Sequence, residues 1–204
     1  MASTQSTTPD KRGRVSWRRF AAILLPSLAA VGVLVILTAQ SVLAVSLSIS
    51  GEAFTVTARQ LKGQGFEQFG TIDNSAGKVP PGNSNEIVLT TNAIRSATLT
   101  DLCQSVTIGG LTLRITAGTG STPVRATNLV VDADRLSGNA SFTQIQIGRD
   151  ASTLNEVPGI RGPAGDFGQQ AETVTIDNLR QHAYATTAGT FTLPDFGLSF
   201  GGAC

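Results

Sequence analysis

The sequence has few of the residues from which metal and catalytic sites are usually built. It contains one histidine and two cysteines, and only 14% of its 204 residues are charged. A single histidine cannot form a histidine-rich metal site, and the two cysteines form no cluster with it. We therefore expect the protein to bind no metal and no cofactor in such a site.

Basic residues are scarce outside the N-terminus. From residue 45 onward the chain carries ten Lys and Arg against thirteen Asp and Glu, so the overall net charge of +1 comes from the N-terminal segment. A nucleic-acid-binding domain would instead show a basic patch or stripe. The sequence therefore argues against nucleic acid as a partner.

One long apolar stretch is present, at residues 20–43. Between residues 20 and 38 only Ser27 and Thr38 are polar, and none is charged. Nineteen helical residues would span about 28 Å, close to the hydrocarbon thickness of a bilayer. The cluster of basic residues before the stretch consists of Lys11, Arg12, Arg14, Arg18 and Arg19. By the positive-inside rule this cluster predicts a cytoplasmic N-terminus and export of the rest of the chain.

Two interpretations of the apolar stretch remain open. It is either a signal peptide cleaved after Ala44 or an uncleaved transmembrane helix. Both give the same organisation: a basic cytoplasmic segment at 1–19, a membrane-directed segment at 20–44 and an extracytoplasmic domain at 45–204. The protein is then either secreted or anchored in the cell membrane, with the membrane as a partner through residues 20–43 if they are retained.

The two cysteines, Cys103 and Cys204, both lie in the part expected to be exported. Outside the cytoplasm an even pair of cysteines usually forms a disulfide. Such a bond would join the last residue to the middle of the domain. The alternative is two separate buried thiols.

The exported part alternates between apolar and polar residues with the period of β-strands. Candidate strands lie at residues 45–50, 54–58, 87–91, 97–100, 102–108, 111–117, 129–133, 142–147, 174–176, 183–187 and 191–193. No segment of this part has a convincing helical period. We predict an all-β domain, a single roll or sandwich of about ten strands. A β-solenoid is the alternative, because polar turns followed by a leucine recur at Leu61, Leu102, Leu136 and Leu179, although at irregular intervals.

Local signals indicate where the strands turn. Gly109-Gly110 predicts a two-residue hairpin. The apolar positions change parity at Asp101, which predicts a bulge or turn there that would make Cys103 face away from Leu102, Val106 and Ile108. A second parity shift, between residues 142 and 145, suggests another bulge. Two stretches rich in proline and glycine, 73–85 and 150–169, predict long exposed loops.

The candidate catalytic residues are Ser199 and His182. Residues 197–201 read Gly-Leu-Ser-Phe-Gly, the pattern of a hydrolase nucleophile elbow. That elbow requires a following helix, and only three residues follow Gly201, none of them acidic or histidine. We therefore interpret the pattern as a final strand marked by glycines, and His182 as a residue without an assigned partner.

Asp132 and Asp134 are candidate cation ligands, since two carboxylates two residues apart share a strand face and could bind calcium. Carboxylates at this spacing usually face water, and the sequence supplies no further cluster of ligands. We therefore favour a solvated pair over a metal site.

Four segments and the N-terminal lead carry a family resemblance. They are Asp101-Leu-Cys-Gln-Ser-Val106, Thr122-Pro-Val-Arg-Ala-Thr-Asn-Leu129, Phe142-Thr-x-Ile-x-Ile-Gly148, Ala185-Thr-Thr-Ala-Gly-Thr-Phe191 and Trp17-Arg-Arg-Phe20. Over nearly its whole length, including both cysteines, the chain resembles a family of actinobacterial exported proteins, typified by Streptomyces. That family has no known function, although some members bear an automatic "cholesterol esterase" label. No catalytic motif of the family maps onto this sequence.

Three hypotheses of function follow. The first is a non-enzymatic cell-surface β-domain with a structural or interaction role, since the strand pattern contains no convergent polar site. The second is an exported protein that binds an apolar ligand or lipid in a cleft of the roll. The third is an esterase. Partners in the cell envelope, either protein or lipid, fit the first two.

Overall fold

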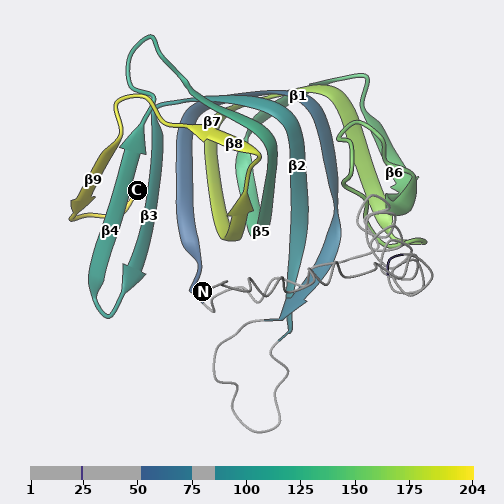
Figure 1. Ribbon diagram of the computed structural model, residues 1–204, viewed down its shortest axis with the longest axis horizontal. Helices are drawn as coiled ribbons and strands as arrows, with labels where there is room; N and C mark the ends of the chain where they lie inside the picture. The colour runs from purple at the N-terminus through teal and green to yellow at the C-terminus, as the bar shows by residue number, and fades with distance from the viewer. Residues whose placement is uncertain (1–23, 25–51, 75–85) are drawn as a thin grey trace, which may run out of the picture. The chain divides into compact units, whose positions relative to one another are not determined.

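The computed structural model describes residues 24, 52–74 and 86–204. Apart from Leu24, these residues belong to one compact unit built mainly of antiparallel strands (Figure 1). The elements are β1 (Phe54–Asn74), β2 (Glu86–Thr100), β3 (Leu102–Ile108), β4 (Leu111–Ala117), β5 (Val124–Thr143), β6 (Gln146–Asp150), the 3-10 helix η1 (Ala151–Thr153), β7 (Phe167–Thr187), β8 (Thr190–Thr192) and β9 (Gly197–Phe200). The prediction of an all-β domain is confirmed.

The nine strands form one sheet in the order β6-β7-β5-β2-β1-β3-β4-β9, with β8 beside β5. The four long strands also pair in a closed circuit, because β1 and β5 each pair with both β2 and β7. The fold is therefore a roll made from a single sheet and not a sandwich of two sheets. Its antiparallel pairing also differs from the parallel coils of a β-solenoid.

Strands β3, β4 and β9 extend the sheet beyond the circuit, and we call these three strands the wing (Figure 1). The wing joins the roll where Thr55 of β1 pairs with Ser105 of β3. At its far end Gly109 and Gly110 have φ values of 58° and 82°. Positive φ at both positions is what a tight hairpin turn requires, so the predicted hairpin is confirmed.

Several of the predicted strands are parts of longer ones. Residues 174–176 and 183–187 both lie on β7, and residues 129–133 and 142–143 both lie on β5. The alternation stops between these pieces because the backbone kinks there, while the strand pairing continues. The predicted strand at 45–50 and most of the predicted loop at 73–85 lie outside the described residues.

Two kinks lie at the same level on either side of β1, at Asp101 and Asn178, both with φ of 53°. Strands β2 and β3 keep one register along β1 on either side of Asp101. A residue with left-handed backbone interrupts the alternation of side chains between the two faces. Leu102 is therefore buried on the same face as Leu99, although an uninterrupted strand would place them on opposite faces. The parity shift predicted at Asp101 is confirmed, and Cys103 faces the opposite side of the sheet from Leu102.

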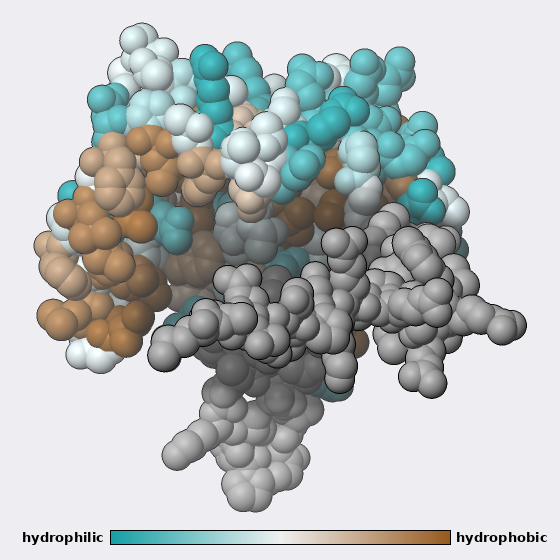
Figure 2. All heavy atoms as spheres, in the orientation of Figure 1, coloured by the Kyte–Doolittle hydropathy of each residue, from teal (hydrophilic) through white to brown (hydrophobic). Residues whose placement is uncertain are grey.

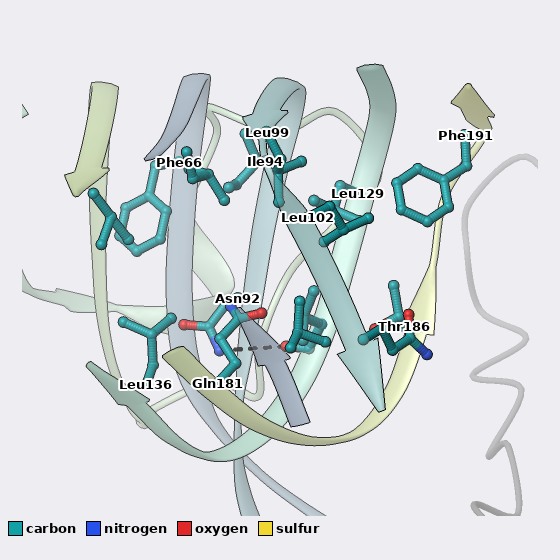
Figure 3. A pocket seen from close by; sticks show the side chains of 15 residues that line it. Phe66, Asn92, Ile94, Leu99, Leu102, Leu129, Leu136, Gln181, Thr186 and Phe191 are labelled. Carbon is teal, nitrogen blue, oxygen red and sulfur yellow. Dashed lines mark hydrogen bonds between the residues drawn. The ribbon is translucent and has the colours of Figure 1, made fainter. Parts of the chain in front are cut away.

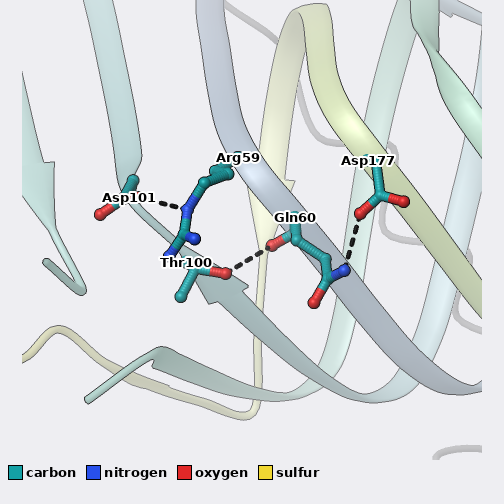
Figure 4. Close-up of polar contacts among 5 residues, drawn as sticks. All are labelled: Arg59, Gln60, Thr100, Asp101 and Asp177. Atoms are coloured by element: carbon teal, nitrogen blue, oxygen red, sulfur yellow. Dashed lines mark hydrogen bonds and ion pairs between the residues drawn. The ribbon is translucent and has the colours of Figure 1, made fainter. Parts of the chain in front are cut away.

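Polar contacts hold the kinks on the outer surface (Figure 4). The Arg59 guanidinium lies 2.6 Å from the Asp101 carboxylate. Gln60 Nε2 donates to Asp177 Oδ1 at 2.6 Å, and the Thr100 hydroxyl donates to the Gln60 carbonyl at 3.4 Å. These contacts link β1 to both of its neighbours at the level where the strands bend.

The second predicted shift is also present. Gln144, between β5 and β6, has φ of 53°. The two strands nevertheless pair with β7 in one register, since Thr143 lies opposite Thr173 and Gln146 lies opposite Gln170. The chain therefore kinks once and continues along the same neighbour.

The inward faces of the four long strands form the main core, which includes Leu61, Ile94, Leu99, Leu129, Val174, Ile176 and Leu179. Gly63 lies within this core. A Cβ at that position would come within 2.6 Å of Ile94 Cγ2 and 2.9 Å of Val174 Cγ1. Glycine is therefore needed for β2 and β7 to pack closely against β1.

The predicted disulfide joins Cys103 to Cys204 with a Cα–Cα distance of 5.9 Å. The Cys204 amide also donates to Ser105 Oγ at 3.0 Å, and Arg180 Nη1 donates to the Cys204 carbonyl oxygen at 3.4 Å. The C-terminus is thereby fastened across the outer face of β3. Closing a loop of this length stabilises the fold by up to about 4–5 kcal/mol in the chain-entropy model.

Within residues 24, 52–74 and 86–204, no helix has both the length and the apolar character needed to cross a bilayer. The apolar stretch at 20–43 lies outside the described residues except for Leu24. Its role as a signal or anchor stays a prediction.

We expect Asn178→Val to lower the free energy of unfolding by about 1–2 kcal/mol. The left-handed backbone at this position strains a β-branched side chain, whereas asparagine adopts it more readily than most residues other than glycine. Thr175→Val is the matched control, since Thr175 lies on the same strand, where valine is favourable. Urea unfolding of both variants measures the difference. Equal stability of the two variants would contradict the assigned role of the kink.

Candidate functional site

A mostly apolar cavity lies inside the roll, beside the point where the wing begins (Figure 3). Fifteen residues from β1, β2, β3, β5, β7 and β8 line it; eleven are apolar and none is charged. The cavity has a volume of about 30 Å³, counted as the space in which the centre of a water molecule fits. That volume holds about two or three waters, so a larger ligand would have to extend out of the cavity.

Asn92 and Gln181 are the buried amides in the cavity wall (Figure 3). Both polar atoms of the Asn92 amide already form hydrogen bonds within the protein. Its Nδ2 donates to the carbonyls of Thr90 and Val131 at 3.0 and 3.3 Å, and its Oδ1 accepts from Gln68. Gln181 is only 6% exposed, yet no described residue forms a hydrogen bond with its amide. Its amide atoms are not fully enclosed, because they border the cavity, so Gln181 is available to hydrogen-bond a ligand there.

Strand register places a second glutamine on the same side of the sheet as Gln181. Gln181 of β7 and Gln104 of β3 both lie opposite Val56 of β1, so they share the cavity side two strand spacings apart, about 10 Å. The same row continues through Ile115 of β4 to Leu198 of β9. The row that contains the two amides therefore continues as an apolar strip on the wing, formed by Ile115 and Leu198.

The cavity side of the wing is apolar out to its tip. Residues directly opposite one another share a face, and the pairs Ile108–Leu111, Val106–Leu113, Leu113–Phe200 and Ile115–Leu198 all lie on this side. Figure 2 shows hydrophobic residues gathered over β3, β4 and β9. Phe200 is 72% exposed and Leu111 is 66% exposed. An apolar surface of this kind on a folded domain usually marks a binding site.

The candidate catalytic residues do not come together. His182 Nδ1 lies 2.7 Å from Asp134 Oδ1, and the His182 ring packs edge-on against Tyr184. Ser199 lies on the same outer row, but the register from His182 through Thr55, Ser105 and Arg114 to Ser199 crosses four strand spacings. That is about 19 Å along the sheet, far beyond hydrogen-bond reach.

The two candidate cation ligands have different partners. Asp132 accepts a hydrogen bond from the Thr91 hydroxyl at 2.7 Å, on β2, whereas Asp134 contacts His182 on β7. Burial raises the pKa of Asp132, the Thr91 hydrogen bond opposes this, and the charge of Asp73 adds to the rise. In the part of the chain that the structure describes, no three His, Cys, Asp or Glu side chains gather into a metal site.

The predicted loop at 150–169 is exposed at most of its residues, as expected, but it also packs against the sheet and forms a cover there. Ala151, Leu154 and Val157 are buried, and two of them form a small second core with Phe69 on the outer face of β1. Proline and glycine correctly indicated irregular backbone, but composition does not report what lies beneath. β7 begins at Phe167, so the loop is also shorter than predicted.

Polar residues fasten this cover at both ends. Asp150 accepts hydrogen bonds from the Ser152 hydroxyl and amide and from the Gly165 amide, and these bonds lower the pKa of Asp150. The buried amide of Gln170 both accepts from and donates to Asn155 at 2.9 Å. The loop is therefore held to β7 as well as to β1.

Glu67 lies under the cover and is 0% exposed. Its Oε1 accepts from the Val157 amide at 2.7 Å, while its Oε2 is the one buried side-chain oxygen or nitrogen without a partner among the described residues. Burial raises the pKa of Glu67, and the hydrogen bond from Val157 offsets part of that rise. The fold therefore favours the protonated carboxylic acid.

A model of the Family of unknown function (DUF6230) matches residues 50–204. The chain belongs to this family. The match covers every strand from β1 to β9 and both cysteines. Searches of curated proteins and of solved structures returned no match. Membership in DUF6230 therefore agrees with the expected family of unknown function and leaves the function to be argued from the site.

Sequence reasoning missed the glutamines of this DUF6230 domain. Gln104 interrupts an otherwise apolar set of alternating positions, Leu102, Val106 and Ile108, and this interruption was the available signal. Gln181 gave no such signal, because only the pairing of β7 with β1 shows that it faces the cavity. Glu67 was likewise hidden, since its burial depends on a loop ninety residues away in the chain.

The Glu67 environment predicts a pH-dependent stability for the DUF6230 domain. A raised folded pKa means that the native state binds the proton more tightly than the unfolded state, whose value is about 4.5. Stability from this group is then present below that value and is lost as pH rises through the folded pKa. Glu67→Gln, which mimics the neutral acid, should become progressively more stable than the parent as pH rises from about 4.5.

Thermal unfolding of the parent and Glu67→Gln across this pH range measures the effect. Glu172→Gln is the control, because Glu172 is exposed on the neighbouring strand β7. A difference between Glu67→Gln and the parent that does not change with pH would show that Glu67 is not the titrating group.

Proposed function

We propose that the domain is a non-enzymatic binding module of the cell surface that takes a neutral amphiphile, a molecule with one long aliphatic tail and an uncharged polar head. The observation that carries this proposal is the unpartnered amide of Gln181 in an apolar cavity that opens onto an apolar strip. Such an arrangement pairs one hydrogen-bonding point with a long hydrophobic contact, as lipid sites do.

The wall chemistry favours an uncharged head group. Amides both donate and accept hydrogen bonds, so Gln181 and Gln104 can bind a hydroxyl, an ester or an amide. None of the cavity-lining residues is charged. A charged head would lose its hydration without gaining a counter-charge, which is strongly unfavourable.

The dimensions favour a tail that lies on the wing. A cavity of about 30 Å³ has room for the head group but not for a long chain. The strip through Ile115 and Leu198 toward Phe200 begins beside Gln104 and continues outward. The bound molecule would therefore hold its head between the glutamines and rest its tail along β4 and β9.

An exported location supports this function. The apolar stretch at 20–43 and the basic cluster before it predict export, and the Cys103–Cys204 disulfide is typical of oxidising compartments. A non-enzymatic role is supported by the four strand spacings between Ser199 and His182. The envelope lipids outside the cytoplasm are a ready source of neutral amphiphiles.

We expect Gln181→Leu to stabilise the domain and weaken ligand binding. Leucine has a similar size and leaves no polar group unsatisfied, so the free energy of unfolding should rise by about 1 kcal/mol. Binding of a long-chain alcohol should weaken about tenfold, the effect of losing one hydrogen bond of this strength. Urea unfolding and displacement of a fluorescent fatty alcohol by the long-chain alcohol measure the two quantities.

Asn92→Leu is the matched control, because Asn92 lines the same cavity but already spends its hydrogen bonds within the protein. It should destabilise the domain. The fatty acid of the same chain length tests the head group and should bind less tightly than the alcohol. Equal binding by the parent and Gln181→Leu, or tighter binding of the acid, would overturn the proposed ligand class.

A further inference from the structure

The tip of the wing exposes apolar side chains at its hairpin turn. Ile108 and Leu111 flank the hairpin turn and are 61% and 66% exposed, and Phe200 lies one strand away. These three side chains share one face, since Ile108 lies opposite Leu111 and Phe200 lies opposite Leu113. A projecting hairpin with bulky aliphatic and aromatic residues is suited to insertion between lipid head groups.

With the apolar stretch retained in a membrane, the length of the connecting segment allows the tip to reach the bilayer. Ten residues, 44–53, separate the end of the apolar stretch from the start of β1. Fully extended they span at most about 35 Å. β1 enters the sheet beside the wing, where Thr55 pairs with Ser105, and Ile108 lies only three residues, about 10 Å, further along β3.

The charges of the wing also suit a lipid surface. Strands β3, β4 and β9 contain one charged residue, Arg114, and no carboxylate. The nearest acidic residues in the chain, Asp101 and Asp195, lie before β3 and before β9, at the base of the wing. Arg114 lies on the face opposite the apolar side chains, and the exposed Glu52 precedes β1 where that strand runs beside β3, so the tip's contact with lipid would be apolar rather than electrostatic.

We propose that the tip of the wing, formed by Ile108, Leu111 and Phe200, docks into the outer surface of a lipid bilayer. The docking strengthens membrane attachment, because a tethered tip meets the bilayer at a high effective concentration. It also turns the apolar strip toward the lipids. The contact depends on the exposed tip alone and not on a ligand in the cavity.

The test places a tryptophan reporter on each face of one strand in the full-length chain. Trp17→Phe first removes the only native tryptophan. Phe200→Trp then reports from the apolar face, and Ser199→Trp, one residue earlier, reports from the opposite face. Each protein is reconstituted in vesicles of phosphatidylethanolamine and phosphatidylglycerol that contain lipids with brominated acyl chains, which quench a nearby indole.

We expect several-fold stronger quenching, with a blue-shifted emission, for Phe200→Trp than for Ser199→Trp. Leu111→Trp, paired with Thr112→Trp, repeats the comparison on β4 in case the first pair does not fold. Adding Gln181→Leu should leave the quenching unchanged, which separates this test from that of the ligand site.

Two outcomes overturn the proposal. Equal quenching from the two faces would show that the tip does not enter the lipid. A blue shift of the Phe200→Trp emission without quenching, together with dimers trapped by chemical crosslinking, would assign the face to a second copy of the chain.

Discussion

The fold depends on keeping apolar side chains inward along strands that bend. A strand alternates its side chains between two faces, so a strand that curls into a roll must correct its pattern wherever the backbone kinks. Asp101 and Asn178 make this correction by adopting left-handed backbone. Leu102 and Leu179, which follow them, are buried as a result. Without the correction, Leu102 and Leu179 would face outward.

The same correction divides the wing into two functional faces. Because the pattern turns over at Asp101, Gln104 faces the cavity, while Cys103 faces outward and meets Cys204. The disulfide and the C-terminal hydrogen bonds stabilise the outer face without occupying the inner one. The inner face therefore keeps an apolar surface that residues 52–74 and 86–204 leave exposed.

Two buried polar side chains in the described part of the domain lack a hydrogen-bond partner for at least one of their atoms. Gln181 has an amide without a partner, and Glu67 has a carboxylate oxygen without one. The two differ in their surroundings, because Gln181 borders a cavity that a ligand can enter, whereas Glu67 is sealed beneath Val157. A polar group beside accessible space can bond to an entering molecule, while burial of a sealed carboxyl raises its pKa and couples the fold to pH.

The sequence by itself determined the features that arise from neighbouring residues. Alternation identified the all-β class, Gly109-Gly110 identified the hairpin, the parity change identified the kink at Asp101, and the pair of cysteines in the part expected to be exported identified the disulfide. It did not determine which strands are neighbours, since alternating segments are nearly interchangeable until they pair. Pairing alone placed Gln181 beside Gln104, separated Ser199 from His182 and buried Glu67 under a distant loop. The candidate site was decided by the tertiary structure, because each of its contacts joins residues far apart in the chain.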